Sequence, residues 1–180
     1  MIRAFVAISL PDDVRALLAV QQFLTPLPRK VEPSLLHLTL AFLGEVSGEV
    51  LEAAHDRFAT LRVPGFSVRL RGFGLFGGER PRAFWAGVEP SEPLACLQGK
   101  VAQAARQAGC KVEARRFVPH VTLGRFPPPG RTQTMRLERA VVDGAGFVAG
   151  PWDVTDFCLL QSHPGPKGPR YDELARYPLS

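Results

Sequence analysis

Two short segments, one in each half of the chain, repeat the pattern His-x-Thr-Leu. The first is His37-Leu38-Thr39-Leu40 and the second is His120-Val121-Thr122-Leu123. Residues i and i+2 of a β-strand share a face, so each histidine lies beside the threonine of its own motif. The apolar residues between them point to the opposite face. Each segment is therefore predicted to be a strand that buries an apolar row and presents a histidine–threonine pair on its other side.

Two imidazoles and two hydroxyls around one cavity would suit a phosphodiester substrate. Imidazole has an ordinary pKa of about 6.5, so it can give or take a proton near neutral pH. One histidine would activate a water and the other would protonate the departing ribose oxygen. The threonine hydroxyls would donate to the non-bridging phosphate oxygens. Neither motif contains a carboxylate, and hard cations prefer oxygen ligands, so we expect no metal or other cofactor.

A single His-x-Thr strand has a simpler interpretation. It is more often a partly buried histidine beside a threonine that favours strands. Two matching copies in a chain that has only four histidines favour a functional pair.

The elements that would position the motifs alternate between strands and helices. Pro11-Asp12-Asp13 is typical of a helix start, and Ser47 is a suitable N-cap for a second helix. Pro26, Pro28 and Pro33 predict an extended approach to the first motif. We expect helices at about 11–23, 47–61 and 92–108, and strands at about 2–9, 35–43, 66–73, 83–88, 117–126, 152–161 and 171–177.

This pattern indicates an α+β protein with largely antiparallel sheets. The two motifs lie in opposite halves of the chain, and each follows a helix and an extended segment. That arrangement predicts a pseudo-symmetric protein with two lobes in which residues 1–180 form one bilobal domain. Each lobe would contribute one His-x-Thr pair to a common cleft.

Composition narrows the environment and the partners. The 180 residues carry a net charge of +5, which favours polyanionic partners, although a basic proteome or simple solubility would also explain it. The three cysteines are odd in number and form no Cys-x-x-Cys pair, which is typical of reduced thiols in the cytosol. No apolar run approaches the roughly 20 residues that cross a bilayer. We therefore expect a cytoplasmic protein with no membrane partner, and we take a monomer as the default because the sequence does not indicate an oligomeric state.

Several weaker signals receive structural interpretations. The glycines of Gly72-x-Gly74-x-x-Gly77 resemble a dinucleotide fingerprint, but no helix start follows, so we expect a turn between strands. His55 is expected on a solvated helix face and His163 in a Pro/Gly-rich loop. Four aromatic residues would stack a base beside the cleft or pack in the core, and the core is expected for at least two of them: Phe73, Phe76, Phe84 and Trp85.

With these residues, the chain resembles the two-histidine phosphoesterases, and specifically the bacterial and archaeal RNA 2′,3′-cyclic phosphodiesterases, also called 2′-5′ RNA ligases. Besides the motifs, the resemblance includes the segments 3–8, 36–45, 80–88, 117–125 and 171–179. The chain has Leu35 where the family usually has Asn two residues before its first motif histidine. It also has Leu160-Gln161-Ser162 where the family has Tyr-Arg-Ser.

The resemblance implies a bilobal α+β fold, with an antiparallel sheet and helices in each lobe and an active cleft between them. It implies that His37 is the proton donor and His120 the proton acceptor, with Thr39 and Thr122 on the phosphate. It also places Arg125 near the phosphate. Strand parity alone would send Arg125 to the core side, so a turn or bulge at Gly124 must redirect it.

The function implied is metal-independent hydrolysis of RNA 2′,3′-cyclic phosphate ends to a 2′-phosphomonoester, with possible reversible 2′-5′ ligation. The substrates would be RNA with such an end, for example tRNA fragments, or small cyclic nucleotides. The alternative is a noncatalytic module that only binds RNA ends through the same side chains.

Overall fold

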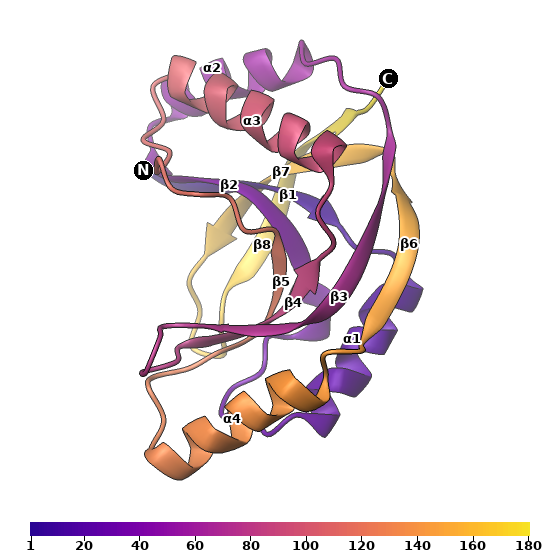
Figure 1. The fold of residues 1–180 in the computed structure, drawn as a ribbon. Helices are drawn as coiled ribbons and strands as arrows, with labels where there is room; N and C mark the ends of the chain where they lie inside the picture. The colour runs from indigo at the N-terminus through magenta and orange to yellow at the C-terminus, as the bar shows by residue number, and fades with distance from the viewer.

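The computed structural model describes all residues, 1–180, as eight strands and four α-helices, with one short 3-10 turn (Figure 1). The strands are β1 (Ile2–Ser9), β2 (His37–Val46), β3 (Phe66–Phe76), β4 (Ala83–Val88), β5 (His120–Arg125), β6 (Val148–Val154), β7 (Asp156–His163) and β8 (Arg170–Pro178). The helices are α1 (Asp12–Leu24), α2 (Gly48–Ala59), α3 (Glu92–Gln107) and α4 (Arg131–Asp143), and the turn is η1 (Pro33–Leu35). The prediction of an α+β fold is confirmed.

All neighbouring strands pair antiparallel, in the order β6-β3-β4-β5-β2-β1-β7-β8. The two central strands are the ones that carry the His-x-Thr motifs. They join through a single pair of register partners, Leu38 and Val121. We call the strands on one side of this junction the β2 lobe (β2, β1, β7 and β8) and those on the other the β5 lobe (β5, β4, β3 and β6). The two predicted antiparallel sheets are thus continuous with each other.

The lobes are related by a pseudo-two-fold arrangement in which they exchange helices. Helix α1 connects β1 to β2 but contacts β5 and β6 of the other lobe. Helix α3 connects β4 to β5 and packs on β2. Figure 1 shows α2 and α3 together at one end of the molecule and α1 and α4 at the other. Because each connecting helix packs on the opposite lobe, the two motif strands are held in one framework.

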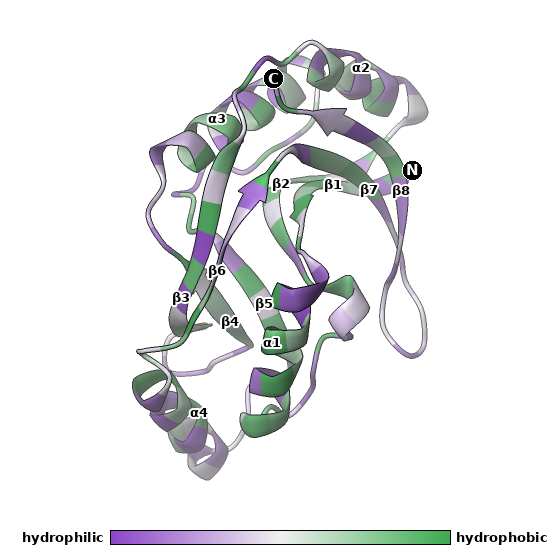
Figure 2. Ribbon diagram, turned by 90° about the vertical axis from the view of Figure 1, so that its right-hand side faces the viewer, coloured by the Kyte–Doolittle hydropathy of each residue, from purple (hydrophilic) through white to green (hydrophobic).

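The core is one cluster of buried side chains that includes residues of both lobes. Leu38 and Val121, the residues between each histidine and its threonine, are both fully buried in it. In Figure 2, hydrophobic positions accordingly alternate with more hydrophilic ones along the central strands. Truncating a fully buried leucine to alanine typically costs about 2–5 kcal/mol, so this apolar row anchors the motif strands firmly. None of the helices is both long and apolar enough to cross a membrane.

Several predictions about strand boundaries were wrong. The strand expected at 117–126 is shorter, His120–Arg125, and the one expected at 66–73 extends to Phe76. The strand expected from residue 35 begins at His37, and Pro33–Leu35 form the turn η1. Proline's fixed φ suits the first position of a helical turn, which explains why Pro33 does not extend the chain there. The single strand expected at 152–161 is two strands, β6 and β7, which pair with β3 and β1 in opposite lobes.

Two other features were also misjudged. Helix α4 was not predicted, because only one of its residues, Leu137, is buried and its N-cap Gly130 gives no side-chain cap. The glycines expected to form a turn lie partly inside β3, at Gly72 and Gly74. A side chain at position 74 would collide with the Trp85 indole, so Gly74 makes room for that ring rather than for a turn.

Candidate active site

The two His-x-Thr motifs lie side by side at the junction of the lobes. Because Leu38 pairs with Val121 in antiparallel register, His37 lies across from Thr122 and Thr39 lies across from His120. Directly opposed residues in such a pair have Cβ atoms about 4.5–5.5 Å apart. Both histidine–threonine pairs therefore share one face of the sheet, opposite the buried leucine and valine.

The two imidazoles are held by the same backbone contact. Nδ1 of His37 lies 2.7 Å from the carbonyl oxygen of Leu35, and Nδ1 of His120 lies 2.6 Å from that of Val118. A carbonyl oxygen can only accept, so Nδ1 carries the proton in each ring. Each Nε2 is therefore the atom left to exchange a proton with a substrate, as a base when neutral and as an acid when charged.

Each motif strand contains a β-bulge just after its threonine. In β2 the register shifts between Val6–Ala41 and Ala7–Thr39, which leaves Leu40 unpaired. In β5 the same shift leaves Leu123 unpaired, between the pairs Trp85–Thr122 and Phe84–Gly124. A bulge turns the following side chains by one position. The irregularity expected near Gly124 is thus present, and it returns Arg125 to the cleft face.

The helix that crosses from the other lobe supports each bulge. The Gln22 amide of α1, which is almost fully buried, donates to the carbonyl oxygen of Leu123 at 2.9 Å and to that of Val31 at 2.7 Å. The Gln98 amide of α3 donates to the carbonyl oxygen of Leu40 at 3.3 Å. Buried carbonyls need such partners. The exchanged helices therefore stabilise the two bulges in equivalent ways.

Arg125 acts electrostatically on both histidines. Burial is the main cause that lowers the pKa of His37, and the charges of Arg125 and His120 lower it further, against a raising effect of the Leu35 bond. Burial likewise lowers the pKa of His120, and Arg125 and Arg115 add to this. A positive charge disfavours the protonated form of an imidazole, so Arg125 contributes to the lowered pKa of both rings.

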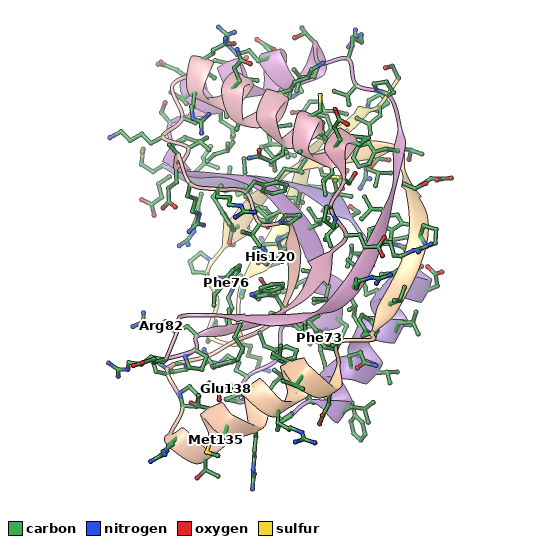
Figure 3. All side chains as sticks on the ribbon, in the orientation of Figure 1. Phe73, Phe76, Arg82, His120, Met135 and Glu138 are labelled. Carbon is green, nitrogen blue, oxygen red and sulfur yellow. The ribbon has the colours of Figure 1, made fainter.

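The surroundings of the two rings differ. His37 packs against Phe5, with ring centroids 4.9 Å apart, and against the edge of Tyr171 at 5.4 Å. His120 meets Phe76 edge-on at 4.8 Å and lies 5.8 Å from Trp85. Figure 3 shows Phe76 next to His120. Aromatic pairs of this kind contribute about 0.5–1.5 kcal/mol each, enough to favour one ring orientation.

The four aromatic residues singled out in the sequence divide evenly. Phe84 is fully buried in the core, and Phe73 packs against it and stacks on Phe147. Phe76 and Trp85 contact each other and His120. The expectation that at least two of them pack in the core is confirmed.

A cavity of about 940 Å³ opens beside the motifs. It is lined by four of the five predicted site residues: Thr39, His120, Thr122 and Arg125. Five more cations line it: Arg29, Arg82, Lys111, Arg115 and Arg116. The one acid is Glu113, which pairs with Arg115 at 3.2 Å. His37 is not part of this lining. The cavity therefore reaches His120 but not His37, is lined by residues of both β2 and β5, and is strongly basic.

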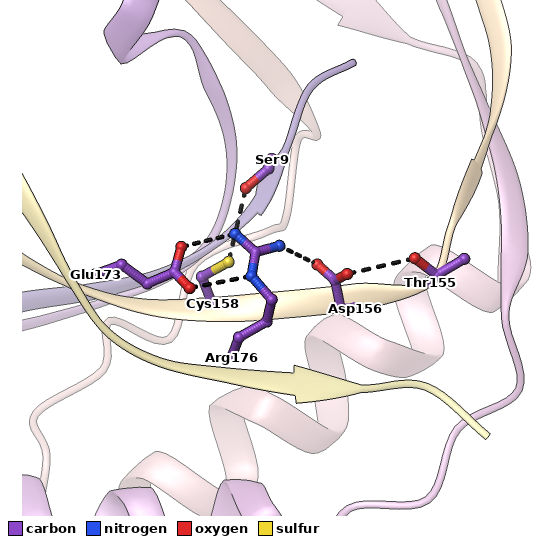
Figure 4. A network of polar contacts seen from close by, with 6 residues as sticks. All are labelled: Ser9, Thr155, Asp156, Cys158, Glu173 and Arg176. Carbon is purple, nitrogen blue, oxygen red and sulfur yellow. Dashed lines mark hydrogen bonds and ion pairs between the residues drawn. The ribbon is translucent and has the colours of Figure 1, made fainter. Parts of the chain in front are cut away.

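The β7–β8 edge next to His37 is held by a polar network (Figure 4). Arg176 pairs with Asp156 and Glu173, and the hydroxyl of Ser9 lies 3.6 Å from the Cys158 sulfur. Ser9 is the register partner of His37 on β1. Burial raises the pKa of the Cys158 thiol, which keeps it neutral and unreactive. This network stabilises the strands that enclose His37.

The other two histidines lie outside the cavity lining. His163, expected in a loop, ends strand β7, and its Nε2 pairs with Asp172 at 2.8 Å. It belongs to the strand because it pairs with Arg170 across the β7–β8 hairpin. His55 is exposed on α2, as expected, and its Nδ1 bonds to the hydroxyl of Tyr177 at 2.8 Å. Nowhere do three or more His, Cys, Asp or Glu side chains gather as a metal site would require.

Sequence reasoning missed several residues around the motifs. Phe5 and Tyr171 were seen only as parts of longer similar segments, and nothing in the local pattern put them next to His37. The cations at 111–116 gave a usable signal, because Arg115 and Arg116 stand only a few positions before His120. Arg29 and Arg82 come from loops distant in sequence, and only the fold brings them to the cavity.

Two imidazoles with free Nε2 atoms on adjoining strands, two hydroxyls and a guanidinium define an enzyme of the two-histidine phosphoesterase class. A model of the 2′-5′ RNA ligase superfamily matches residues 10–166. The RNA 2′,3′-cyclic phosphodiesterase of Archaeoglobus fulgidus is 32% identical over 96% of this chain and 97% of its own length. That of Thermus thermophilus is 36% identical over 98% of this chain and 90% of its own.

The fold agrees with these matches. The crystal structure of E. coli LigT complexed with 3′-AMP superposes with a TM-score of 0.76 at 30% identity, and covers 99% of this chain and 98% of that one. The chain therefore belongs to the 2′-5′ RNA ligase superfamily.

Proposed function

We propose that the protein hydrolyses 2′,3′-cyclic phosphate ends of RNA to 2′-phosphomonoesters, with His37 as the proton donor and His120 as the proton acceptor. Thr39, Thr122 and Arg125 bind the phosphate. The observation that carries the proposal is the pair of Nδ1 contacts to Leu35 and Val118, which leave the Nε2 atom of each histidine free on adjoining strands. Such a pair can give and take a proton in the same step.

The reaction needs only these groups. Nε2 of His120 takes a proton from water, whose oxygen forms the new bond to phosphorus. The bond from phosphorus to the ribose O3′ breaks, and O3′ takes the proton from Nε2 of His37. Negative charge collects on the non-bridging oxygens, where the hydroxyls of Thr39 and Thr122 donate and Arg125 supplies positive charge. A positioned acid or base contributes about 10²–10⁴-fold each.

The relatives support the choice of substrate. The proteins from Archaeoglobus fulgidus and Thermus thermophilus bear the name RNA 2′,3′-cyclic phosphodiesterase. The E. coli protein of the same fold was crystallised with 3′-AMP, a ribonucleoside phosphate. The Arg125 guanidinium, which lines the cavity together with His120 and both threonines, suits the same chemistry, since phosphates are drawn to positive charge.

The same groups can run the reaction with another nucleophile. If a 5′-hydroxyl of a second RNA takes the place of water, His120 removes its proton and the product is a 2′-5′ phosphodiester. By microscopic reversibility the enzyme would also cleave that bond. We therefore include reversible 2′-5′ ligation in the proposal.

The test is product analysis of a cyclic-phosphate-ended oligonucleotide incubated with the protein in excess EDTA. We expect full conversion to the 2′-phosphate, because the donor set consists of imidazoles, hydroxyls and a guanidinium. Activity lost in EDTA and restored by a divalent ion would contradict the metal-free mechanism. Tight binding of the oligonucleotide without turnover would instead favour a module that only holds RNA ends.

A further inference from the structure

The two sides of the reacting phosphorus face different environments. In a displacement at phosphorus the attacking and leaving oxygens lie roughly in line. With the roles proposed above, the leaving ribose oxygen is on the His37 side and the nucleophile is on the His120 side. His37 is packed between Phe5 and Tyr171, whereas His120 lines the large cavity and His37 does not. The open space therefore lies on the side from which the nucleophile comes.

This space is much larger and more charged than a water nucleophile requires. Six cations line it, against one acid that is already paired with Arg115. In Figure 3, Phe76 lies between His120 and Arg82, so the basic wall continues beyond the histidine. Cations arranged along a groove are what a nucleic-acid backbone binds.

Apolar surface accompanies the charge. Phe42 is 47% exposed and Phe76 36% exposed, and both rings line the cavity. A groove that combines cations with exposed rings is typical of single-strand binding, because bases stack on the rings while phosphates meet the cations. Lys111 and Arg116 stand on the exposed segment between α3 and β5, and no acidic partner neutralises either of them.

We propose that this cavity is a binding site for the RNA strand that carries the 5′-hydroxyl. That strand enters in ligation and departs in 2′-5′ cleavage, and Lys111 and Arg116 bind its first phosphates. The inference rests on the function proposed above. The step is balanced without a further reactant: the hydroxyl proton goes to His120, the new P–O5′ bond replaces P–O3′, and O3′ takes its proton from His37.

A series of 2′-5′-linked substrates tests the location. In one set the departing 5′-hydroxyl side grows from a single nucleoside to several nucleotides. In the other set the side that keeps the phosphate grows instead. We expect the first series to raise kcat/KM for cleavage and the second to have little effect. Equal gains from both series, or a gain from the second alone, would overturn the inference.

The double variant Lys111→Glu/Arg116→Glu tests the residues. It should abolish the gain from lengthening the departing strand, a loss of about tenfold per phosphate contact. Hydrolysis of the cyclic-phosphate-ended oligonucleotide should stay within about twofold of the unaltered protein, since that strand lies on the other side. The matched control Arg57→Glu/Arg136→Glu makes the same charge change at exposed helix positions outside the cavity and should retain the gain.

The outcomes separate the two proposals. No hydrolysis by the unaltered protein would reject the proposed function itself. Hydrolysis without any 2′-5′ cleavage would reject the inference and leave the hydrolase intact. Oligonucleotide hydrolysis that falls in the Lys111/Arg116 variant, while a cyclic mononucleotide is still hydrolysed normally, would show that the cavity binds the cyclic-ended strand instead.

Discussion

The backbone around the two motif histidines is alike in both lobes, but the side chain five residues after each histidine differs. Nδ1 of each histidine bonds to the carbonyl oxygen two residues earlier. Each strand has a bulge one residue after its threonine, and a carbonyl oxygen in each bulge accepts a hydrogen bond from a glutamine amide of the crossing helix. Five residues after each histidine, however, β2 carries Phe42 and β5 carries Arg125.

This difference shows that the repeated backbone gives both imidazoles the same orientation, whereas the side chains around each imidazole determine its acid–base role. The backbone presents two equivalent Nε2 atoms. The β2 lobe then surrounds its imidazole with Phe5 and Tyr171, while the β5 lobe adds a cation and opens onto the basic cavity. An acid and a base can thus be made from one repeated motif, because the pKa of each ring depends on its own surroundings.

The largest effects should come from removing either imidazole. His37→Ala and His120→Ala should each lower turnover by about 10²–10⁴-fold, the usual contribution of a placed proton-transfer group. Steady-state rates on the cyclic-phosphate-ended oligonucleotide would measure this. The double variant should be little worse than the poorer single variant, because groups that act in one step are not additive.

The pH profiles of these variants separate the two roles. Loss of His120, the base, should remove the acidic limb of the rate profile, and loss of His37, the acid, should remove the alkaline limb. A folded single variant with near-normal turnover would show that the two motifs are not both used.

Replacing Arg125 should have the next largest effect. Arg125→Leu should slow turnover by about 10²-fold, the loss typical of one group that stabilises transition-state charge. Both histidine pKa values should rise, since the Arg125 charge lowers both. NMR titration of the two rings would measure the shifts. Arg125→Lys keeps the charge and should recover the pKa values better than the rate; unchanged pKa values in Arg125→Leu would place the guanidinium away from the rings.

The glutamines that support the bulges should differ in their contribution to stability. Gln22→Met removes a donor from two carbonyl oxygens, one buried and one half-buried, which should cost about 1–3 kcal/mol of unfolding free energy. Gln98→Met removes one longer bond at a half-buried position, where water can substitute, and should cost under about 1 kcal/mol. Urea unfolding of the two variants would measure the difference. Equal losses would mean that the bulges are not supported in the way the distances indicate.

Much of the site was predictable because strand parity and the repeated motif are local properties. The alternation in Leu36-His37-Leu38-Thr39 requires one buried and one presented face, and the structure has both. The repetition of the motif predicted two lobes. The bulge near Gly124 required the family resemblance as well, because strand parity alone sends Arg125 to the core side and only the resemblance places it near the phosphate.

The rest depended on contacts between distant parts of the chain. Helix α4 buries one residue and has no capping side chain, so its sequence lacks the apolar period by which helices are recognised. Gly74 suggested a turn because the Trp85 ring that requires it lies on the next strand. The packing of Tyr171 on His37 joins residues 134 positions apart, and no local pattern carries that information.

The smallest predicted effects concern the aromatic side chains that pack on the His37 and His120 imidazoles. The pH dependence of kcat/KM would measure them. Burial lowers the pKa of both histidines below 6.5, so kcat/KM, which reports the free enzyme, should peak below pH 6.5.

Tyr171→Ala opens the surroundings of His37 and should move only the alkaline limb of the rate profile to higher pH. Phe76→Ala opens those of His120 and should move only the acidic limb to higher pH. Tyr171→Phe keeps the ring against His37 and should leave the profile in place. Each shift should be a fraction of a pH unit, because one ring supplies only part of the desolvation. If Tyr171→Ala moved the acidic limb instead, the acid and base would have to exchange histidines, and the comparison of the two lobes would reverse.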